Sequence, residues 1–287
     1  MGALSALVGA PVDRGGVDRG GRRLSWVAGG SGPTVIFEAG AASPVIGFAA
    51  VFKALAADHR VIAYDRAGYG ASEVAPLSLE GQLDDLIAVL ESAGSGVLVG
   101  HSWGGLLVQL ATWARPDLVD GLVLLDPSHE RFWSAPPVLP TDDVRREEQL
   151  ESAREQAATT ARVAGTTPEI EQLLEAACLS YLETPEQMAV HLAELPMILD
   201  HLPELAKRRT EAVWPQLPVV VLTAMKDRPE AFVRPVLDLH GAVAGATNAR
   251  HTVVPDSGHY LHLDRPDLVT EAIREVTGVP FQAVGGV

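Results

Sequence analysis

The sequence predicts an α/β fold, in which a parallel sheet is covered by helices on both faces. Short apolar runs of strand composition alternate along the chain with longer segments whose apolar residues recur at helical spacing. Two of the runs, residues 96–100 and 122–125, contain no polar position, which is typical of strands buried on both faces of a parallel sheet. Such alternation favours one sheet between two layers of helices.

Local patterns set the position of each expected element. Strands are expected where β-rich runs end at Gly, Pro or Asp, at residues 24–27, 34–37, 60–64, 96–100, 122–125, 218–223 and 251–254. Helices are expected where apolar residues share one face, at residues 79–93, 102–114, 229–244 and 266–277. In the first of these helices, Leu83, Leu86 and Leu90 form that face.

Two segments depart from the alternation. Residues 127–214 contain no convincing strand, and prolines divide them into expected helices at 141–163, 168–181, 185–194 and 197–209. Residues 1–21 contain the sequence VDRGG twice and are interpreted as a flexible, Gly-rich lead-in. The expected organisation is therefore a core of residues 22–126 and 215–287, interrupted by a helical insertion at 127–214.

Composition narrows the class of protein. The chain has 287 residues, a formal net charge of −15 and a pI of about 4.9, and such an acidic surface repels nucleic acid and anionic membranes. No apolar run approaches the ~20 residues of a membrane span, and the N-terminus lacks the basic start of a signal peptide. Cys178 is the single cysteine, which excludes an internal disulfide. We expect a cytoplasmic enzyme, monomeric or homodimeric, that acts on small molecules without a cofactor or metal.

Residues 100–104 (GHSWG) carry the strongest chemical signal. They form a G-x-S-x-G element between an expected buried strand and an expected helix. Glycine at both ends permits a tight turn, because a larger side chain there would collide with neighbouring backbone. This context predicts that Ser102 is a nucleophile, held with its hydroxyl exposed at the carboxyl edge of the sheet.

A serine nucleophile needs a general base and a carboxylate that orients the base. His259 follows the last expected strand and is the predicted base. Asp227 and Asp126 each follow an expected strand, and Asp227 is the favoured acid with Asp126 as the alternative. The backbone N–H groups of Trp103 and Ala41 are the expected donors to the oxyanion of the substrate.

Three ordered motifs resemble those of the α/β-hydrolase fold family. Besides residues 100–105 (GHSWGG), residues 64–72 (YDRAGYGAS) are similar to the family's D-R-x-G-x-G-x-S turn, and residues 257–266 (SGHYLHLDRP) to its histidine loop. The resemblance implies an eight-stranded, mostly parallel sheet with a helical cap at 127–214. It maps the usual acid to Asp227 and the acid of some members to Asp126. One departure is Ala39-Gly40 in place of a frequent His-Gly pair, preceded by Glu38, which is expected to be buried.

The expected activity is that of a serine hydrolase, first of all a carboxylesterase that forms an acyl-enzyme on Ser102. Serine at this position argues against a dehalogenase or an epoxide hydrolase, which would need aspartate there. Lactonase, amidase, thioesterase, carbon–carbon bond hydrolase and perhydrolase activities use the same triad and stay open. Two rival hypotheses are a slow ligand receptor and a cofactor-free oxygenase, the latter favoured if Asp126 pairs with His259.

The substrate pocket is expected to be apolar and of moderate size. Its expected contributors lie in the helical insertion and are Phe132, Trp133, Met188, Leu192, Met197 and Ile198.

Overall fold

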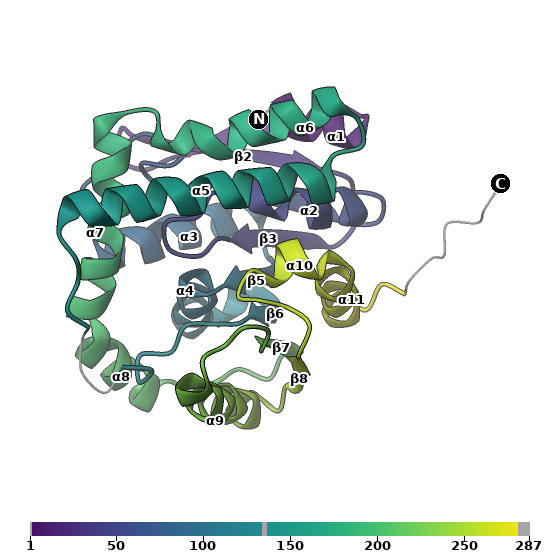
Figure 1. The fold of residues 1–287 in the computed structure, drawn as a ribbon. Coiled ribbons are helices and arrows are strands. Elements are labelled where there is room, and N and C mark those ends of the chain that lie inside the picture. Colours follow the sequence, from purple (N-terminus) through teal and green to yellow (C-terminus); the bar gives the residue numbers. More distant parts are fainter. Residues whose placement is uncertain (1, 134–136, 281–287) are drawn as a thin grey trace.

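The computed structural model describes residues 2–133 and 137–280 and contains one eight-stranded sheet with helices on both faces (Figure 1). The strands are β1 (Asp13–Asp18), β2 (Arg23–Gly29), β3 (Thr34–Glu38), β4 (Arg60–Tyr64), β5 (Gly96–His101), β6 (Val119–Leu125), β7 (Val219–Ala224) and β8 (Arg250–Val254). Their order across the sheet is β1-β2-β4-β3-β5-β6-β7-β8. β2 pairs antiparallel with β1 and with β4, and the other neighbouring strands of the described sheet pair parallel. The predicted fold class is confirmed.

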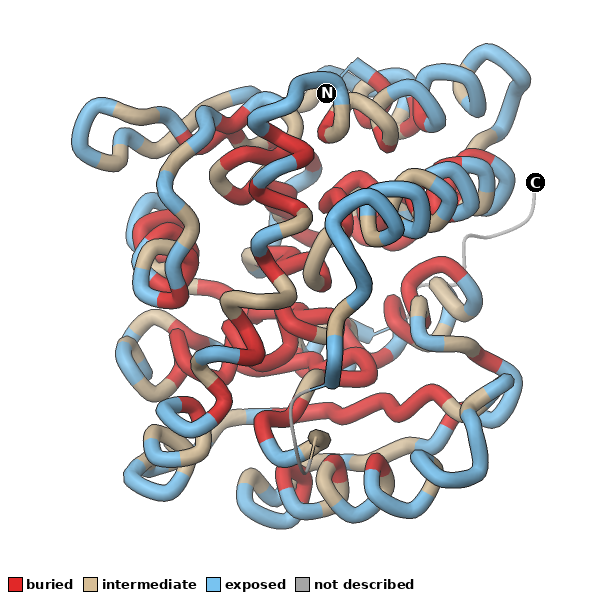
Figure 2. Tube along the Cα trace, turned by 60° about the vertical axis from the view of Figure 1, so that its left-hand side comes forward, coloured by how far each residue is buried: buried red, intermediate tan, exposed pale blue. Residues whose placement is uncertain are grey.

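Each face of the sheet has its own apolar core, and the buried residues concentrate in the central strands and on the inner sides of the helices (Figure 2). One core includes α2 (Ala49–Leu55) and α11 (Pro266–Thr277), together with α1 (Gly2–Val8). The other includes α3 (Leu79–Ala93), α4 (Trp103–Ala114) and α9 (Glu230–Thr247). Short helices complete the connections, at η1 (Val45–Phe48), η2 (Pro116–Leu118) and α10 (Leu261–Asp264).

Local sequence explains where the helices begin and end. The Ser78 hydroxyl accepts the Gly81 N–H and caps α3, which ends at Gly94 with a positive φ of 94°. Thr184 and Gln187 form a reciprocal capping box at the start of α7 (Pro185–Asp200). The expected helix at residues 79–93 therefore has the bounds that its pattern predicts.

Among the described residues, four α-helices and one short 3-10 helix lie between β6 and β7, and we call them the inter-strand helices. They are α5 (Asp142–Ala164), α6 (Pro168–Leu179), η3 (Ser180–Leu182), α7 and α8 (Leu202–Glu211). The expected break near residue 195 is wrong, because α7 continues through Pro196. The ring removes one backbone hydrogen bond, but Ile198 and Leu199 beyond it are buried in the core and keep the helix in place.

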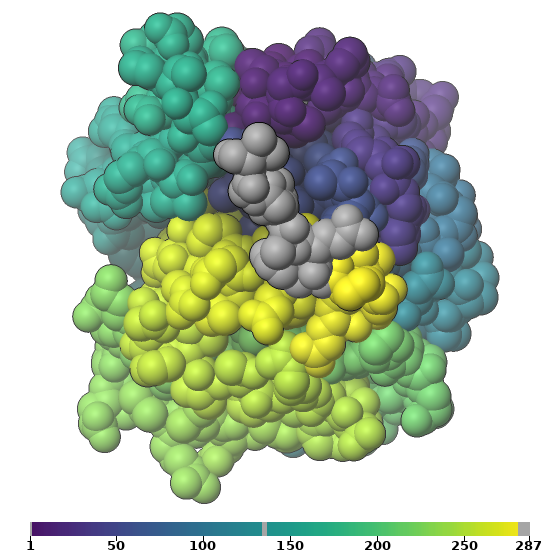
Figure 3. Space-filling view, turned by 90° about the vertical axis from the view of Figure 1, so that its right-hand side faces the viewer, coloured from purple at the N-terminus to yellow at the C-terminus, as the bar shows by residue number. Residues whose placement is uncertain are grey.

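The first 21 residues were expected to be a flexible lead-in, and the structure differs. α1 buries Ala3, Leu4 and Leu7 and packs against α6, so the N-terminal residues lie beside the inter-strand helices (Figure 3). β1 pairs with β2 along its whole length. A Cβ at Gly15 would lie 2.2 Å from the ring of Trp26, so close packing explains one of the glycines that suggested flexibility.

No helix in the described part of the chain is long and apolar enough to cross a membrane.

Candidate active site

Ser102 lies in a strained turn between β5 and α4. Its φ of 51° and ψ of −119° are unusual for a residue with a side chain, and such geometry is costly unless the surroundings enforce it. The two flanking glycines provide the necessary close approach. A Cβ at Gly100 would lie 2.5 Å from the Gly104 carbonyl oxygen, and one at Gly104 would lie 2.4 Å from the carbonyl oxygens of Glu38 and Ala39. The turn therefore has the compact geometry that its glycines predict.

Ser102 opens into a pocket of about 540 Å³ that His259 also lines. The Ser102 N–H donates to the Leu125 carbonyl at 3.0 Å, and the Ser102 carbonyl accepts the Ser128 N–H at 2.8 Å. Ser102 Oγ lies 3.4 Å from the hydroxyl oxygen of Ser128. Within the described residues no hydrogen bond joins Ser102 Oγ to His259, and such contacts often tighten only when substrate is bound.

His259 follows β8 and is oriented from two sides. Its Nδ1 lies 2.6 Å from Asp126 Oδ2, and its carbonyl accepts a hydrogen bond from His101 Nε2 at 2.9 Å. The His101 ring packs against the His259 ring, and burial holds the pKa of His101 well below its usual value. His262 stacks on Phe48 and is also buried, which lowers its pKa to about 3. Burial thus disfavours the charged form of both neighbouring histidines, and His101 also orients the exposed His259 through its hydrogen bond.

The acid beside His259 is Asp126, the alternative, and not the favoured Asp227. β6 is the immediate neighbour of β5, so Asp126 directly follows Leu125 at the position next to Ser102. Asp227 lies beyond the end of β7 in a turn with a φ of 58°, and its side chain is exposed. Among the described residues it makes no hydrogen bond to His259. Both aspartates follow a strand, but only the strand before Asp126 lies next to β5 in the described sheet, and this position decides which aspartate reaches His259.

Asp126 is held in its ionised form. Burial alone would raise its pKa, but the hydrogen bond and charge of His259, together with the charge of Arg228, outweigh burial and lower the pKa. Arg228 Nη2 lies 2.5 Å from the same Oδ2 atom, and the Ala224 N–H donates to Oδ1 at 3.2 Å. Arg228 had no sequence signal of its own, since no motif marks the residue after Asp227.

The loop at residues 39–42 lies directly against the nucleophile. A Cβ at Gly40 would be 3.3 Å from Ser102 Cβ. The Ala41 N–H has no hydrogen-bond partner among the residues that the structure describes. Trp103 is the first residue of α4, so its N–H has no intrahelical acceptor. Both N–H groups are therefore available beside Ser102, and their role toward an oxyanion stays a prediction.

The chain matches the model of the alpha/beta hydrolase family over residues 26–272. It belongs to this family. Among curated relatives, the lipase LipV of Mycobacterium tuberculosis is 42% identical over 71 residues, which are 24% of this chain and 27% of the lipase. The esterase YbfF of Escherichia coli K12 is 24% identical over 239 residues, which are 76% of this chain and 82% of the esterase. The match thus spans about a quarter of the lipase but most of the esterase.

Solved structures of the alpha/beta hydrolase family share the fold. Est816, described as an N-acyl homoserine lactone degrading enzyme, superposes with a TM-score of 0.62 at 20% identity. The superposition covers 91% of this chain and 99% of that chain. Structural similarity at this sequence identity shows a shared fold, and the chemistry depends on the residues of the site.

The pocket of this alpha/beta hydrolase is mostly apolar, with charge at one side. Of the expected contributors, Phe132 and Trp133 line it. The other four, Met188, Leu192, Met197 and Ile198, do not line it, and Met188 and Ile198 are buried in the interior instead. Two apolar residues of α9 that sequence reasoning missed, Val236 and Leu239, take their place. Lys226, Asp227 and Arg228 add charged groups.

The described residues contain no group of three or more His, Cys, Asp or Glu side chains arranged to hold a metal ion. Cys178 is buried, which raises the pKa of its thiol to about 12.

Proposed function

We propose that this protein is a serine hydrolase that cleaves a carboxylic ester, or a similar acyl bond, in a small and largely apolar substrate. The observation that carries the proposal is the contact of 2.6 Å between Asp126 and His259, beside the strained Ser102 and in the same pocket. The similarity to a lipase and an esterase supports the same class of reaction.

In the proposed reaction Ser102, His259 and Asp126 act as nucleophile, general base and orienting acid. Asp126 accepts the Nδ1–H of His259, which leaves Nε2 unprotonated and able to remove the Ser102 proton. Ser102 Oγ attacks the carbonyl carbon, and His259 then protonates the leaving alcohol. Water, deprotonated by His259, hydrolyses the acyl-enzyme. The N–H groups of Ala41 and Trp103 stabilise the oxyanion in both steps, and each such donor contributes about 3–4 kcal/mol.

The pocket supports a small acyl or alcohol group. About 540 Å³ lies within the usual range for small-molecule sites, and aromatic side chains from residues 132 and 133 form one wall. A lactone, an amide or a carbon–carbon bond next to a carbonyl reacts through the same groups, so these substrates are alternatives within one mechanism. Ser102 in the nucleophile position argues against reactions that need an aspartate ester.

The Asp126–His259 pairing also favours one candidate from another class, a cofactor-free oxygenase. There the pair would deprotonate the substrate, and Ser102 would form no covalent bond. The strained geometry of Ser102 supports the hydrolase instead, because proton removal by a histidine–aspartate pair does not require such a turn.

A panel of p-nitrophenyl esters of rising acyl length tests the proposal, with wild type and Ser102→Ala compared. We expect the highest kcat/KM with short to medium chains, and loss of turnover in the variant. Ester turnover that persists in Ser102→Ala would refute the mechanism. Oxygen consumption by both proteins would support the oxygenase. Cytoplasmic location and a monomeric or homodimeric state stay predictions.

A further inference from the structure

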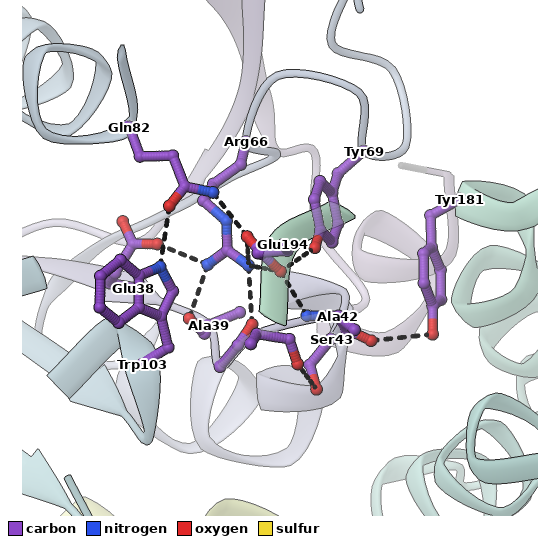
Figure 4. A network of polar contacts seen from close by, with 12 residues as sticks. Glu38, Ala39, Ala42, Ser43, Arg66, Tyr69, Gln82, Trp103, Tyr181 and Glu194 are labelled. Atoms are coloured by element: carbon purple, nitrogen blue, oxygen red, sulfur yellow. Dashed lines mark hydrogen bonds and ion pairs between the residues drawn. The ribbon is translucent and has the colours of Figure 1, made fainter. Parts of the chain in front are cut away.

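A buried cluster of charged residues lies behind the loop at residues 39–42, and we call Glu38, Arg66 and Glu194 the buried carboxylate cluster (Figure 4). The two glutamate side chains have no exposed surface, and Arg66 is 4% exposed. The Arg66 guanidinium contacts both glutamates. Burying such charges is expensive, and apolar residues of similar volume often stabilise a fold as well or better. Their presence therefore calls for a role besides stability.

Arg66 fixes the first half of the loop. Its Nη1 donates to the Ala39 carbonyl and its Nη2 to the Gly40 carbonyl, both at 2.7 Å. Nη1 also donates to Glu38 Oε1 at 2.8 Å, and the Tyr64 hydroxyl donates to the other oxygen of Glu38. The arginine is held in turn by strand residues of the sheet, so this half of the loop is anchored to the core.

Glu194 fixes the second half of the loop from α7, one of the inter-strand helices. Its Oε2 accepts the Ala42 N–H at 2.6 Å and the Tyr69 hydroxyl at 2.6 Å. A second inter-strand helix, α5, holds the other side of the same residue, since Gln149 Nε2 donates to the Ala42 carbonyl at 3.0 Å. Ala42 has a φ of 51°, an unfavourable conformation for a residue with a side chain. The inter-strand helices thus hold both polar backbone groups of a strained residue next to Ala41.

Glu194 is also connected to the nucleophile helix. Its Oε1 accepts from Gln82 Nε2 at 2.5 Å, and Gln82 Oε1 accepts the indole N–H of Trp103 at 2.8 Å. One carboxylate therefore reaches, through Ala42 and through Gln82, the two residues whose backbone N–H groups are the proposed oxyanion donors. Burial opposes the charge of Glu194, but Arg66 and the donors from Tyr69 and Ala42 outweigh it and lower its pKa.

We propose that Glu194 is a positioning residue, through which the inter-strand helices set the oxyanion donors Ala41 and Trp103. This inference rests on the proposed serine hydrolase function. Oxyanion donors stabilise the transition state only when they are held in place before charge develops. The group that holds them should therefore affect kcat more than KM, although it does not touch the substrate.

Glu194→Gln is the decisive variant, because it keeps the size of the side chain and replaces one accepting carboxylate oxygen by a donating amide NH₂. The groups that contact Glu194 are the Ala42 N–H, the Tyr69 hydroxyl, Gln82 Nε2 and Arg66 Nη2, and all of them donate. The amide NH₂ of glutamine would face at least one donor. With p-nitrophenyl butyrate we expect kcat to fall about 10- to 100-fold, up to the range seen for loss of one oxyanion donor, with KM changed less than about twofold.

Binding of a boronic acid distinguishes misplaced oxyanion donors from a general loss of folded structure. An arylboronic acid forms a tetrahedral adduct with the serine and places an oxygen in the oxyanion site, so its Kd should rise by a factor similar to the fall in kcat. Val190→Ala is the matched control on α7. Val190 packs against Gly68 and lies outside the buried carboxylate cluster, so kcat and boronate affinity should stay within about twofold.

The outcomes of these experiments support or overturn the proposed positioning role of Glu194. An unchanged kcat in folded Glu194→Gln would overturn it, as would a lower kcat with unchanged boronate affinity. If Glu194→Gln does not fold, Gln149→Met removes the 3.0 Å hydrogen bond to the Ala42 carbonyl without changing charge, and leaves the longer one from the Tyr181 hydroxyl at 3.4 Å. A several-fold fall in kcat and boronate affinity then supports the inference, and no change overturns it. Activity that persists in Ser102→Ala refutes the hydrolase itself, which is a separate result.

Discussion

Two charged clusters lie at the carboxyl edge of the sheet, on either side of the Ser102 turn, and they differ in their access to solvent. In the first, Asp126 is buried but its partner His259 is 45% exposed and lines the pocket. In the second, the buried carboxylate cluster, neither glutamate side chain has exposed surface. Because of this difference, the first cluster can exchange protons with a substrate, whereas the second can only fix the backbone around it.

The two clusters also use arginine differently. Arg228 shares Asp126 Oδ2 with His259 and so stabilises the charge of the acid that orients the base. Arg66 instead spans two glutamates and donates to two backbone carbonyls of the loop. Variants in the first cluster should therefore change catalysis, and variants at Arg66 should change stability as well.

Asp126→Asn should have the largest effect. An asparagine holds the histidine less well and favours the wrong tautomer, and the corresponding change in a serine triad lowers kcat about 10⁴-fold. We expect a fall of about 10³- to 10⁴-fold in the hydrolysis of p-nitrophenyl esters. Asp227→Asn, one strand further along the same edge, should lower kcat less than about tenfold. The reverse order of the two variants would contradict the assignment of Asp126.

Arg66→Met should have the next largest effect, this time on the free energy of unfolding. It leaves two buried carboxylates without their cation, and loss of one partner of a buried ion pair costs about 3–5 kcal/mol. Urea denaturation followed by circular dichroism measures the change. Arg115→Met is the matched control, because Arg115 forms its ion pairs with Glu91 and Asp117 at the surface. The control should leave the denaturation midpoint unchanged. If both variants lowered the free energy of unfolding equally, burial of the Arg66 ion pairs would not explain the loss.

The sequence predicted the parallel core well, because each element there carries a strong local signal. The expected helix at residues 79–93 and the strand at 60–64 match α3 and β4. The errors lie where tertiary packing overrides the local pattern. Pro196 suggested a break, but burial of the residues beyond it keeps α7 whole, and Gly15 suggested mobility where it makes room for Trp26.

The candidate site was predicted only in part, because some of its residues carry a local signal and others are brought together by tertiary packing. A motif and its flanking elements mark Ser102, and the end of the last strand marks His259. Asp126 and Asp227 each follow a strand and therefore have the same local signature. Which of them reaches His259 depends on which strand lies next to β5, and a single sequence does not give the order of strands in the sheet. Glu194 carries no motif. Its role depends on contacts with Ala42 and Gln82, which are more than a hundred positions away in the chain.

His191→Phe should change the pH dependence of stability. The His191 ring packs at a tilt against the rings of Tyr69 and Tyr181, and both its nitrogens lack a hydrogen-bond partner in the described part of the chain. Burial lowers its pKa to about 4. The unfolded chain, with a histidine pKa near 6.5, binds this proton first. Stability is therefore complete above about pH 6.5 and decreases as the pH falls toward 4.

Phenylalanine removes the proton site and keeps an aromatic ring against the two tyrosines. The loss of unfolding free energy between pH 7.5 and pH 5.0 should be smaller in His191→Phe than in wild type, by on the order of 1–2 kcal/mol. Urea denaturation at the two pH values measures this difference. An unchanged pH dependence would mean that His191 is not held neutral by the fold, and that the region around Glu194 is more open to water than the buried carboxylate cluster requires.

A thiol reagent should have the smallest effect. Cys178 is buried and its thiol has a pKa of about 12, so a thiolate is scarce at neutral pH. We expect that Ellman's reagent leaves ester hydrolysis unchanged and labels Cys178 only after unfolding in urea. Rapid labelling together with loss of activity would point to a cysteine nucleophile in place of Ser102.

Trapping the acyl-enzyme is a direct test of Ser102 as the nucleophile. Asp126→Asn should slow deacylation, so brief incubation with p-nitrophenyl butyrate, followed by intact-protein and peptide mass spectrometry, should reveal a covalent intermediate. We expect a mass increase of one butyryl group per chain, located on Ser102 and absent from the Ser102→Ala variant. An Asp126→Asn variant that still turns over the ester without any adduct on Ser102, or with an adduct on another residue, would contradict this mechanism.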